Sequence, residues 1–159
     1  AIYKGRKGLE PLKKLVAKRT NTRNMKGSLE DVIKGREMFI GVSKGNVLTE
    51  VMVRSMARRP IIFALANPVP EIMPDQARRA GAYIIATGRS DFPNQINNLL
   101  AFPGIFRGAL DNKIKQFSER MFIQAAKNIA AYVKHPTPGR IIPDILDTRV
   151  VREVARAMK

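Results

Sequence analysis

Three asparagines have the residue type and the positions to bind a polar ligand. Asn67 follows an unbroken apolar run at residues 61–66. Pro68 ends that run, because proline cannot donate to a sheet ladder and disfavours helix at the residue before it. Asn97 and Asn98 stand beside an apolar stretch, where amides buried without partners are costly. Two interpretations stay open for this pair: they bind a ligand, or they hydrogen-bond the local backbone of a loop.

The sequence around these amides predicts alternating strands and helices that would position them. Residues 61–66 are typical of a strand buried on both faces, and residues 37–42 and 82–87 are similar short, mostly apolar runs. Helix-like segments at 49–56 and 74–80 separate the three strands. This alternation predicts an α/β fold, a Rossmann-like parallel sheet flanked by helices. All three strand ends then lie at one edge, which is where open parallel sheets bind ligands.

The segment after the third strand is the least regular part of the chain. Asn94 is predicted to cap a short helix, which Phe102-Pro103-Gly104 then ends. Asn97 and Asn98 would lie in the first turns of that helix, where free backbone N–H groups favour an anion. The segment is therefore predicted to receive a carboxylate.

Helices are also predicted on both sides of this central section. Their signals are apolar residues at helical spacing and capping residues, such as Ser28 followed three residues later by Asp31. The predicted ranges are 9–19, 28–35, 117–133 and 149–158.

Length and composition indicate one domain and exclude several classes of protein. The 159 residues contain no cysteine, so disulfides and thiolate chemistry are excluded, which fits a cytoplasmic location. No apolar run approaches the roughly 20 residues that a membrane span requires. His135 is the only histidine, so a metal or triad role for it is not expected. The start at Ala1, without methionine and without a helix or strand signal, leads us to expect a longer protein.

The net charge of +16 raises nucleic acid as a partner. Residues 1–36 hold eleven Lys and Arg against the three acids Glu10, Glu30 and Asp31. However, aromatic residues are 6% of the chain and form no base-stacking cluster, and no nucleic-acid motif accompanies the charge. We therefore interpret the charge as a solvated face. A basic nucleic-acid-binding or scaffolding protein remains the alternative from another class.

The chain lacks the residues that usually complete a dinucleotide site. A Gly-x-Gly-x-x-Gly turn after a first strand is absent, and so is an acid about 20 residues later for the ribose. No paired carboxylates stand at metal-binding spacing. The sequence thus predicts an incomplete cofactor-binding fold, with an amide-rich ligand edge and no catalyst.

Two stretches of the chain are long and highly specific: Ala-Leu-Ala-Asn-Pro-Val-Pro-Glu at 64–71 and Ala-Thr-Gly-Arg-Ser-Asp-Phe-Pro-Asn-Gln-Ile-Asn-Asn at 86–98. With residues 2–6, 39–43 and 102–110, they resemble the malic enzyme family, the decarboxylating malate oxidoreductases, and in particular its shorter bacterial and archaeal type. The resemblance therefore extends over nearly the whole chain.

The resemblance implies that residues 1–159 are part of the family's NAD(P)-binding domain, with C-terminal helices from about residue 117. The family oxidises L-malate with NAD or NADP and decarboxylates the product to pyruvate and CO2 with Mg or Mn. It also implies a homodimer. The first strands, the glycine-rich turn, the catalytic tyrosine and lysine and the metal-binding acids would all precede Ala1.

The resemblance also implies roles for residues at the predicted strand ends. Val42, Ser43, Asn67 and Asn98 would bind the cofactor, and Asn67, Asn97 and Asn98 would bind the substrate. No catalytic residue and no metal ligand is assigned within this chain. Another hydroxy-acid or amino-acid dehydrogenase would fit the end of the second strand alone, but residues 88–104 argue against it.

Overall fold

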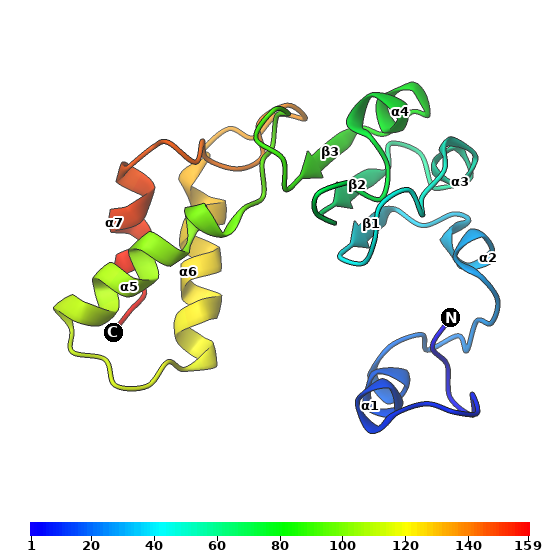
Figure 1. Ribbon diagram of the computed structural model, residues 1–159, viewed down its shortest axis with the longest axis horizontal. Helices are drawn as coiled ribbons and strands as arrows, with labels where there is room; N and C mark the ends of the chain where they lie inside the picture. The colour runs from blue at the N-terminus through cyan, green and yellow to red at the C-terminus, as the bar shows by residue number, and fades with distance from the viewer.

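The computed structural model describes residues 1–159, which form a sheet unit and a helical unit joined by loops (Figure 1). Each unit has its own cluster of buried apolar residues. The sheet unit contains strands β1 to β3 with helices α2, α3 and α4, and the helical unit contains α5, α6 and α7. No helix is both long and apolar enough to cross a membrane.

The sheet consists of three parallel strands in the order β1-β2-β3, which confirms the predicted α/β fold. The strands are β1 (Met38–Gly41), β2 (Ile61–Ala64) and β3 (Ile84–Thr87), each shorter than its predicted range. Strand β2 is central, and its Ile62 and Ala64 are fully buried. The register places the last residues of the three strands in one row: Gly41, Ala64 and Thr87.

Three short helices accompany these strands: α2 (Leu29–Ile33), α3 (Glu50–Arg54) and α4 (Pro74–Arg79). The predicted capping box is confirmed, because the Ser28 hydroxyl accepts the Asp31 N–H and the Asp31 carboxylate accepts the Ser28 N–H. The Ser28 hydroxyl also donates to the Asp31 carboxylate at 2.7 Å, and this hydrogen bond first, then the one from the Ser28 N–H, lowers the pKa of Asp31. The Thr49 hydroxyl caps α3 by accepting the Met52 N–H. The local start signals in the sequence thus locate these helices.

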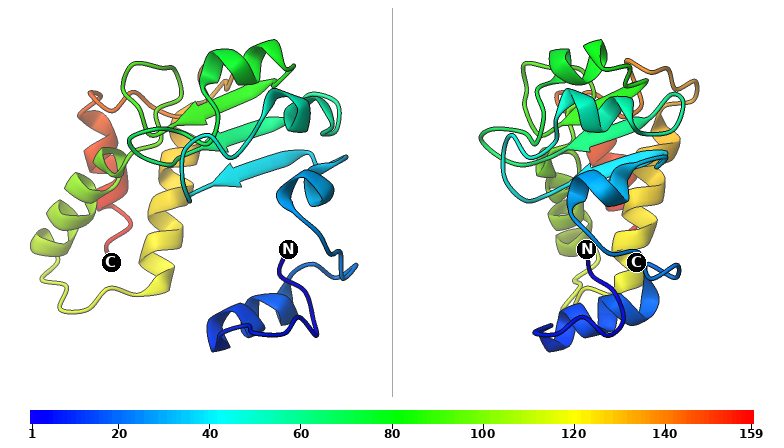
Figure 2. Two further views of the ribbon diagram at one scale, coloured as in Figure 1. Left: turned by 45° about the vertical axis from the view of Figure 1, so that its right-hand side comes forward. Right: turned by 90° about the vertical axis from the view of Figure 1, so that its right-hand side faces the viewer.

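Helix α1 (Pro11–Arg19) stands apart from the sheet in both figures (Figures 1 and 2). The predicted amphipathic helix is present, but its apolar face is largely open to solvent. Leu12 is 76% exposed and Leu15 47% exposed, whereas Ala17 is buried. No other element of this chain covers the rest of that face.

The helical unit packs α5 (Phe102–Asp111) and α6 (Glu119–Tyr132) against α7 (Arg149–Ala155). Close approach of α5 to α7 depends on two glycines. A Cβ at Gly104 would lie 2.5 Å from the Cβ of Val154, and one at Gly108 would collide with the carbonyl of Ala155. The predicted last two helices are confirmed, and α5 joins them in one core.

The prediction that Phe102-Pro103-Gly104 ends a helix is wrong, because α5 begins there. Pro103 occupies the first turn of α5. In a first turn the missing N–H of proline has no helical partner to lose, and its fixed φ suits the helix. Proline therefore marks a start here.

Asp147 links the end of α6 to the start of α7. Its carboxylate accepts the Tyr132 hydroxyl at 2.7 Å and two guanidinium N–H groups of Arg149 at 2.9 and 2.8 Å. The hydrogen bonds from Arg149 first, and then from Tyr132, hold the pKa of Asp147 well below its usual range. The ionised carboxylate thus stabilises the folded helical unit.

Asp147→Asn is expected to lower the melting temperature at pH 7. A carboxyl whose pKa is lower in the folded state stabilises the fold above its unfolded pKa, about 3.9, and loses that effect as the pH falls toward the folded value. The difference in Tm between wild type and variant should therefore shrink between about pH 4 and pH 2. Asp75→Asn is the control, because Asp75 lies 3.7 Å from Arg78 and both are exposed. A difference in Tm that does not change with pH would contradict the assignment.

Candidate functional site at the carboxyl edge of the sheet

The three strands end at one edge, and that edge faces the helical unit. In Figure 2 the arrowheads of β1, β2 and β3 all point toward helices α5 to α7. The loops that follow the strands carry the predicted ligand residues. In open parallel sheets this edge is the usual place for a bound ligand.

Val42 and Ser43 directly follow β1. Val42 is 77% exposed, and Ser43 is exposed as well. The Ser43 N–H donates to the Glu71 carboxylate at 2.9 Å, whereas its hydroxyl forms no hydrogen bond in the chain. The backbone at Ser43 is therefore fixed while its hydroxyl is available.

Asn67 lies three residues beyond the end of β2, and its side chain is exposed. The peptide bond to Pro68 is cis. No group of the chain hydrogen-bonds the Asn67 amide, although the neighbouring Ala66 N–H is held by Glu71 at 3.0 Å. Asn67 is thus a free amide on an anchored loop.

Asn97 and Asn98 are brought back to the end of β3. The Ile96 N–H donates to the Thr87 carbonyl at 2.8 Å, and Gln95 forms a bridge with Thr87. The Asn97 Oδ1 accepts the Leu99 N–H at 3.0 Å, as the local-backbone interpretation predicts. Asn98 is exposed and its side chain has no partner in the chain. The two amides therefore differ: Asn97 is partly used by the fold, and Asn98 is free.

The prediction that Asn94 caps a helix is wrong. Asn94 is only 7% exposed, and its backbone is left-handed with φ 56°. Its amide donates to the carbonyls of Ile85 at 3.0 Å and Pro138 at 2.9 Å, and its Oδ1 accepts the Ile141 N–H at 2.8 Å. All three of these side-chain hydrogen bonds thus join Asn94 to residues outside its own segment. They tie the segment that carries Asn97 and Asn98 to β3 and to the 138–141 loop.

The helix at the asparagine pair is also shorter than predicted. It is a 3₁₀ turn, η1 (Asn98–Leu100), instead of a helix from residue 94. So short a turn aligns few peptide dipoles, and its N-terminus adds little attraction for an anion. The attraction of Asn98 for a ligand must come from its side-chain amide.

Glu71 is the residue of this edge that the sequence patterns did not single out. It is completely buried and holds the backbone N–H groups of both Ser43 and Ala66. The available signal was an acid between Pro70 and Ile72, directly after the strand-end motif. An acid in apolar surroundings needs partners, and here they are backbone N–H groups.

Arg89 and Asp91 form the charged pair nearest to the end of β3. Two guanidinium N–H groups of Arg89 donate to Asp91 at 2.8 and 2.7 Å. This contact raises the pKa of Arg89 and lowers that of Asp91. Because the two charges offset each other, this part of the edge presents mainly neutral groups.

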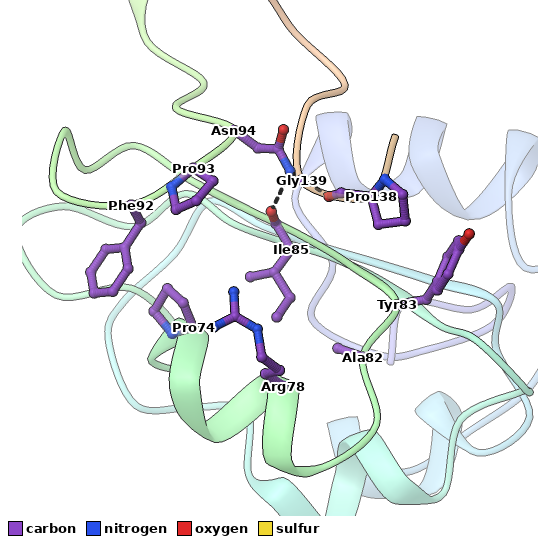
Figure 3. Close-up of a pocket in the computed structure, with 10 residues that line it drawn as sticks. All are labelled: Pro74, Arg78, Ala82, Tyr83, Ile85, Phe92, Pro93, Asn94, Pro138 and Gly139. Atoms are coloured by element: carbon purple, nitrogen blue, oxygen red, sulfur yellow. Dashed lines mark hydrogen bonds between the residues drawn. The ribbon is translucent and has the colours of Figure 1, made fainter. Parts of the chain in front are cut away.

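A cavity of about 160 Å³ lies beside β3 and α4 (Figure 3), and none of the predicted ligand residues lines it. Its ionisable lining groups are Arg78 and Tyr83. Asn94 also lines it, but both of its amide N–H groups are engaged with carbonyls of the chain (Figure 3). We place the ligand at the strand ends, because the unpartnered amides are there.

The residues at this edge suit a nucleotide cofactor. The Ser43 hydroxyl and the Asn67 and Asn98 amides can hydrogen-bond ribose hydroxyls, a carboxamide or a carboxylate. No group of three or more His, Cys, Asp or Glu side chains gathers anywhere in the chain to hold a metal ion. We therefore assign no residue of this chain to a cation.

The sheet, its flanking helices and the polar carboxyl edge define the class as an α/β protein of Rossmann-like architecture. The family model described as malic enzyme, NAD binding domain, matches residues 1–158. The chain therefore belongs to the malic enzyme family, as its motifs indicated.

Curated relatives and a solved structure agree with this assignment. The chain is 53% identical to the bifunctional malic/malolactic enzyme of Bacillus subtilis, over 99% of this chain and 39% of that protein. It is 39% identical to the NADP-dependent malic enzyme of Halomonas elongata, over 99% of this chain and 40% of that protein. The crystal structure of the NAD-dependent malic enzyme of Thermotoga maritima is 48% identical, with a TM-score of 0.89 over 95% of this chain and 40% of that one. The chain thus spans about two-fifths of the length of these relatives.

Proposed function

We propose that this chain is the cofactor-binding part of a malic enzyme, which oxidises L-malate with NAD or NADP and releases pyruvate and CO2. The observation that carries the proposal is the pair of free amides, Asn67 and Asn98, at the carboxyl edge of the sheet. They stand in the motifs that most closely resemble the family. A full-length protein containing this chain should reduce NAD or NADP when malate is added, and should form pyruvate. Failure of both cofactors would contradict the proposal.

Each residue at the edge has a role in this proposal. The segment at Val42 and Ser43 lies along the cofactor ribose, and Asn67 donates its amide to that ribose or to the substrate. Asn98 also contacts the cofactor. The free Nδ2 of Asn97 and the amide of Asn98 donate to the carboxylate and hydroxyl of malate. NAD or NADP, when bound, would supply the hydride acceptor. These residues would orient the cofactor and the substrate, and such positioning is a large part of catalysis.

We also propose that the whole protein is a homodimer, as the family resemblance implies, and that it works in the cytoplasm, which the absence of cysteine fits. The family's decarboxylation uses Mg or Mn, and the ligands of that cation are proposed to lie outside this chain. The nucleic-acid-binding alternative has only the net charge of +16 in its favour.

The 159-residue chain by itself is expected to turn over no malate. Hydride transfer from an alcohol requires a general base, and this chain offers no evident acid–base set at its ligand edge. The measurement is the absorbance of NADH or NADPH after malate and Mn²⁺ are added, with the full-length protein as the positive control. Metal-dependent turnover by the chain alone would show that it carries a catalyst we have not assigned.

A further inference from the structure

Glu71 is a buried acid whose partners are all backbone N–H groups. Its Oε1 accepts from Ser43 at 2.9 Å and its Oε2 from Ala66 at 3.0 Å. No Lys or Arg forms an ion pair with it. One carboxylate thus joins the loop after β1 to the loop after β2. These are the two loops that carry Ser43 and Asn67.

The main chain joins the same two loops a second time. The Asn46 N–H donates to the Pro70 carbonyl at 3.1 Å, and the Leu48 N–H donates to the Glu71 carbonyl at 2.9 Å. A Cβ at Gly45 would lie 2.8 Å from the Cβ of Val69, so the loops are in close contact there. Both loops are therefore held at their far ends by the backbone, and at the strand ends by the Glu71 side chain.

Gly41, the last residue of β1, makes room for this arrangement. A Cβ at Gly41 would collide with the carboxyl group of Glu71, although its φ is outside the left-handed region. Glycine is thus required at position 41 for a steric reason, namely the space taken by the Glu71 side chain. Gly41 and Glu71 act as a matched pair.

We propose that Glu71 is a positioning residue that sets the distance between Ser43 and Asn67, so that both reach one cofactor molecule. This inference rests on the proposed function of the edge. A carboxylate can hold two N–H donors at once because each oxygen accepts. Glutamine of the same shape keeps one acceptor and turns an N–H₂ group toward the other donor. Residues that touch a ligand bind it precisely only when supporting hydrogen bonds hold them in place, which is the role proposed here for Glu71.

The first test is the affinity of the full-length protein for NADH and NADPH, followed by the fluorescence of the reduced nicotinamide. Glu71→Gln is expected to raise the dissociation constant about tenfold, the equivalent of one lost hydrogen bond. Val154→Ala is the control, because it removes completely buried apolar atoms from the helical unit and destabilises the protein away from this edge. It should lower the melting temperature and leave the affinity unchanged.

The second test uses the steric pairing and does not depend on Glu71→Gln alone. Gly41→Ala should weaken cofactor binding by displacing the Glu71 carboxylate. In a Glu71→Ala background the added methyl group meets no carboxylate, so Gly41→Ala should cause little further loss of cofactor affinity. Non-additivity of this kind identifies residues that act through each other.

The outcomes separate the inference from the proposed function. If wild type binds neither NADH nor NADPH, the proposed function fails and Glu71 has no such role. If wild type binds but Glu71→Gln binds equally well, only the positioning role is overturned. The positioning role would also be overturned if Glu71→Gln and Val154→Ala lost cofactor affinity equally. Additive losses of affinity for Gly41→Ala and Glu71→Ala would overturn it as well.

Discussion

Replacing Asn94 with glycine is expected to lower the free energy of unfolding by about 3 kcal/mol, because the buried Asn94 side chain loses three hydrogen bonds at about 1 kcal/mol each. The groups left without a partner are the carbonyls of Ile85 and Pro138 and the N–H of Ile141. Asn94→Ala should lose about 1 kcal/mol more, since φ is 56° there and a Cβ disfavours that conformation. Urea denaturation measures both values.

The matched control for Asn94 is Asn98→Ala, which removes an exposed amide without a partner in the chain. Its free energy of unfolding should stay within about 0.5 kcal/mol of wild type. If Asn94→Gly is as stable as wild type, its three hydrogen bonds do not hold the sheet and the 138–141 loop together.

Asn67→Ala and Asn98→Ala are each expected to reduce kcat/KM of the full-length protein about 10- to 150-fold. The physical reason is the loss of a hydrogen bond to a charged or polar ligand group, worth roughly 1.5–3 kcal/mol when the partner is ionised. The melting temperature without ligand should change little, because both amides are exposed and water replaces the ligand. Malate kinetics and thermal unfolding of the two variants measure the two effects.

Gln116→Ala is the control for these variants. Gln116 is another exposed amide without a hydrogen bond, and it lies in the loop between α5 and α6 rather than at the strand ends. Its kinetics should match wild type. If both asparagine variants keep the wild-type kinetics, the carboxyl edge of the sheet is not the ligand site. If they also have a lower Tm, the two amides stabilise the fold instead.

The sheet was predictable because its signals are local. Six consecutive apolar residues at 61–66 indicate a buried strand, although β2 ends at Ala64, before the run itself ends. The Ser28 capping box and the Thr49 cap likewise depend on residues three positions apart. Parallel pairing then follows from the alternation of strands and helices, and it places the predicted ligand residues at one edge.

The roles of Asn94 and Glu71 were not predictable in the same way. Asn94 bonds to residues 44 and 47 positions away, and Glu71 reaches Ser43 across 28 positions. Contacts of this length depend on how the loops close after the sheet has formed, and no local pattern encodes them. Both residues are polar and buried, so each needed a partner that only the folded chain reveals.

A crystal structure of the full-length protein with NADH and a non-reactive dicarboxylate analogue of malate tests the proposed ligand site most directly. The side-chain amides of Asn67 and Asn98 should lie within about 3.2 Å of oxygen or nitrogen atoms of these ligands. Glu71 should keep both of its backbone partners. Ligands bound elsewhere, for example in the cavity at Arg78 and Tyr83, with both amides still facing solvent, would show that the strand ends are not the ligand site.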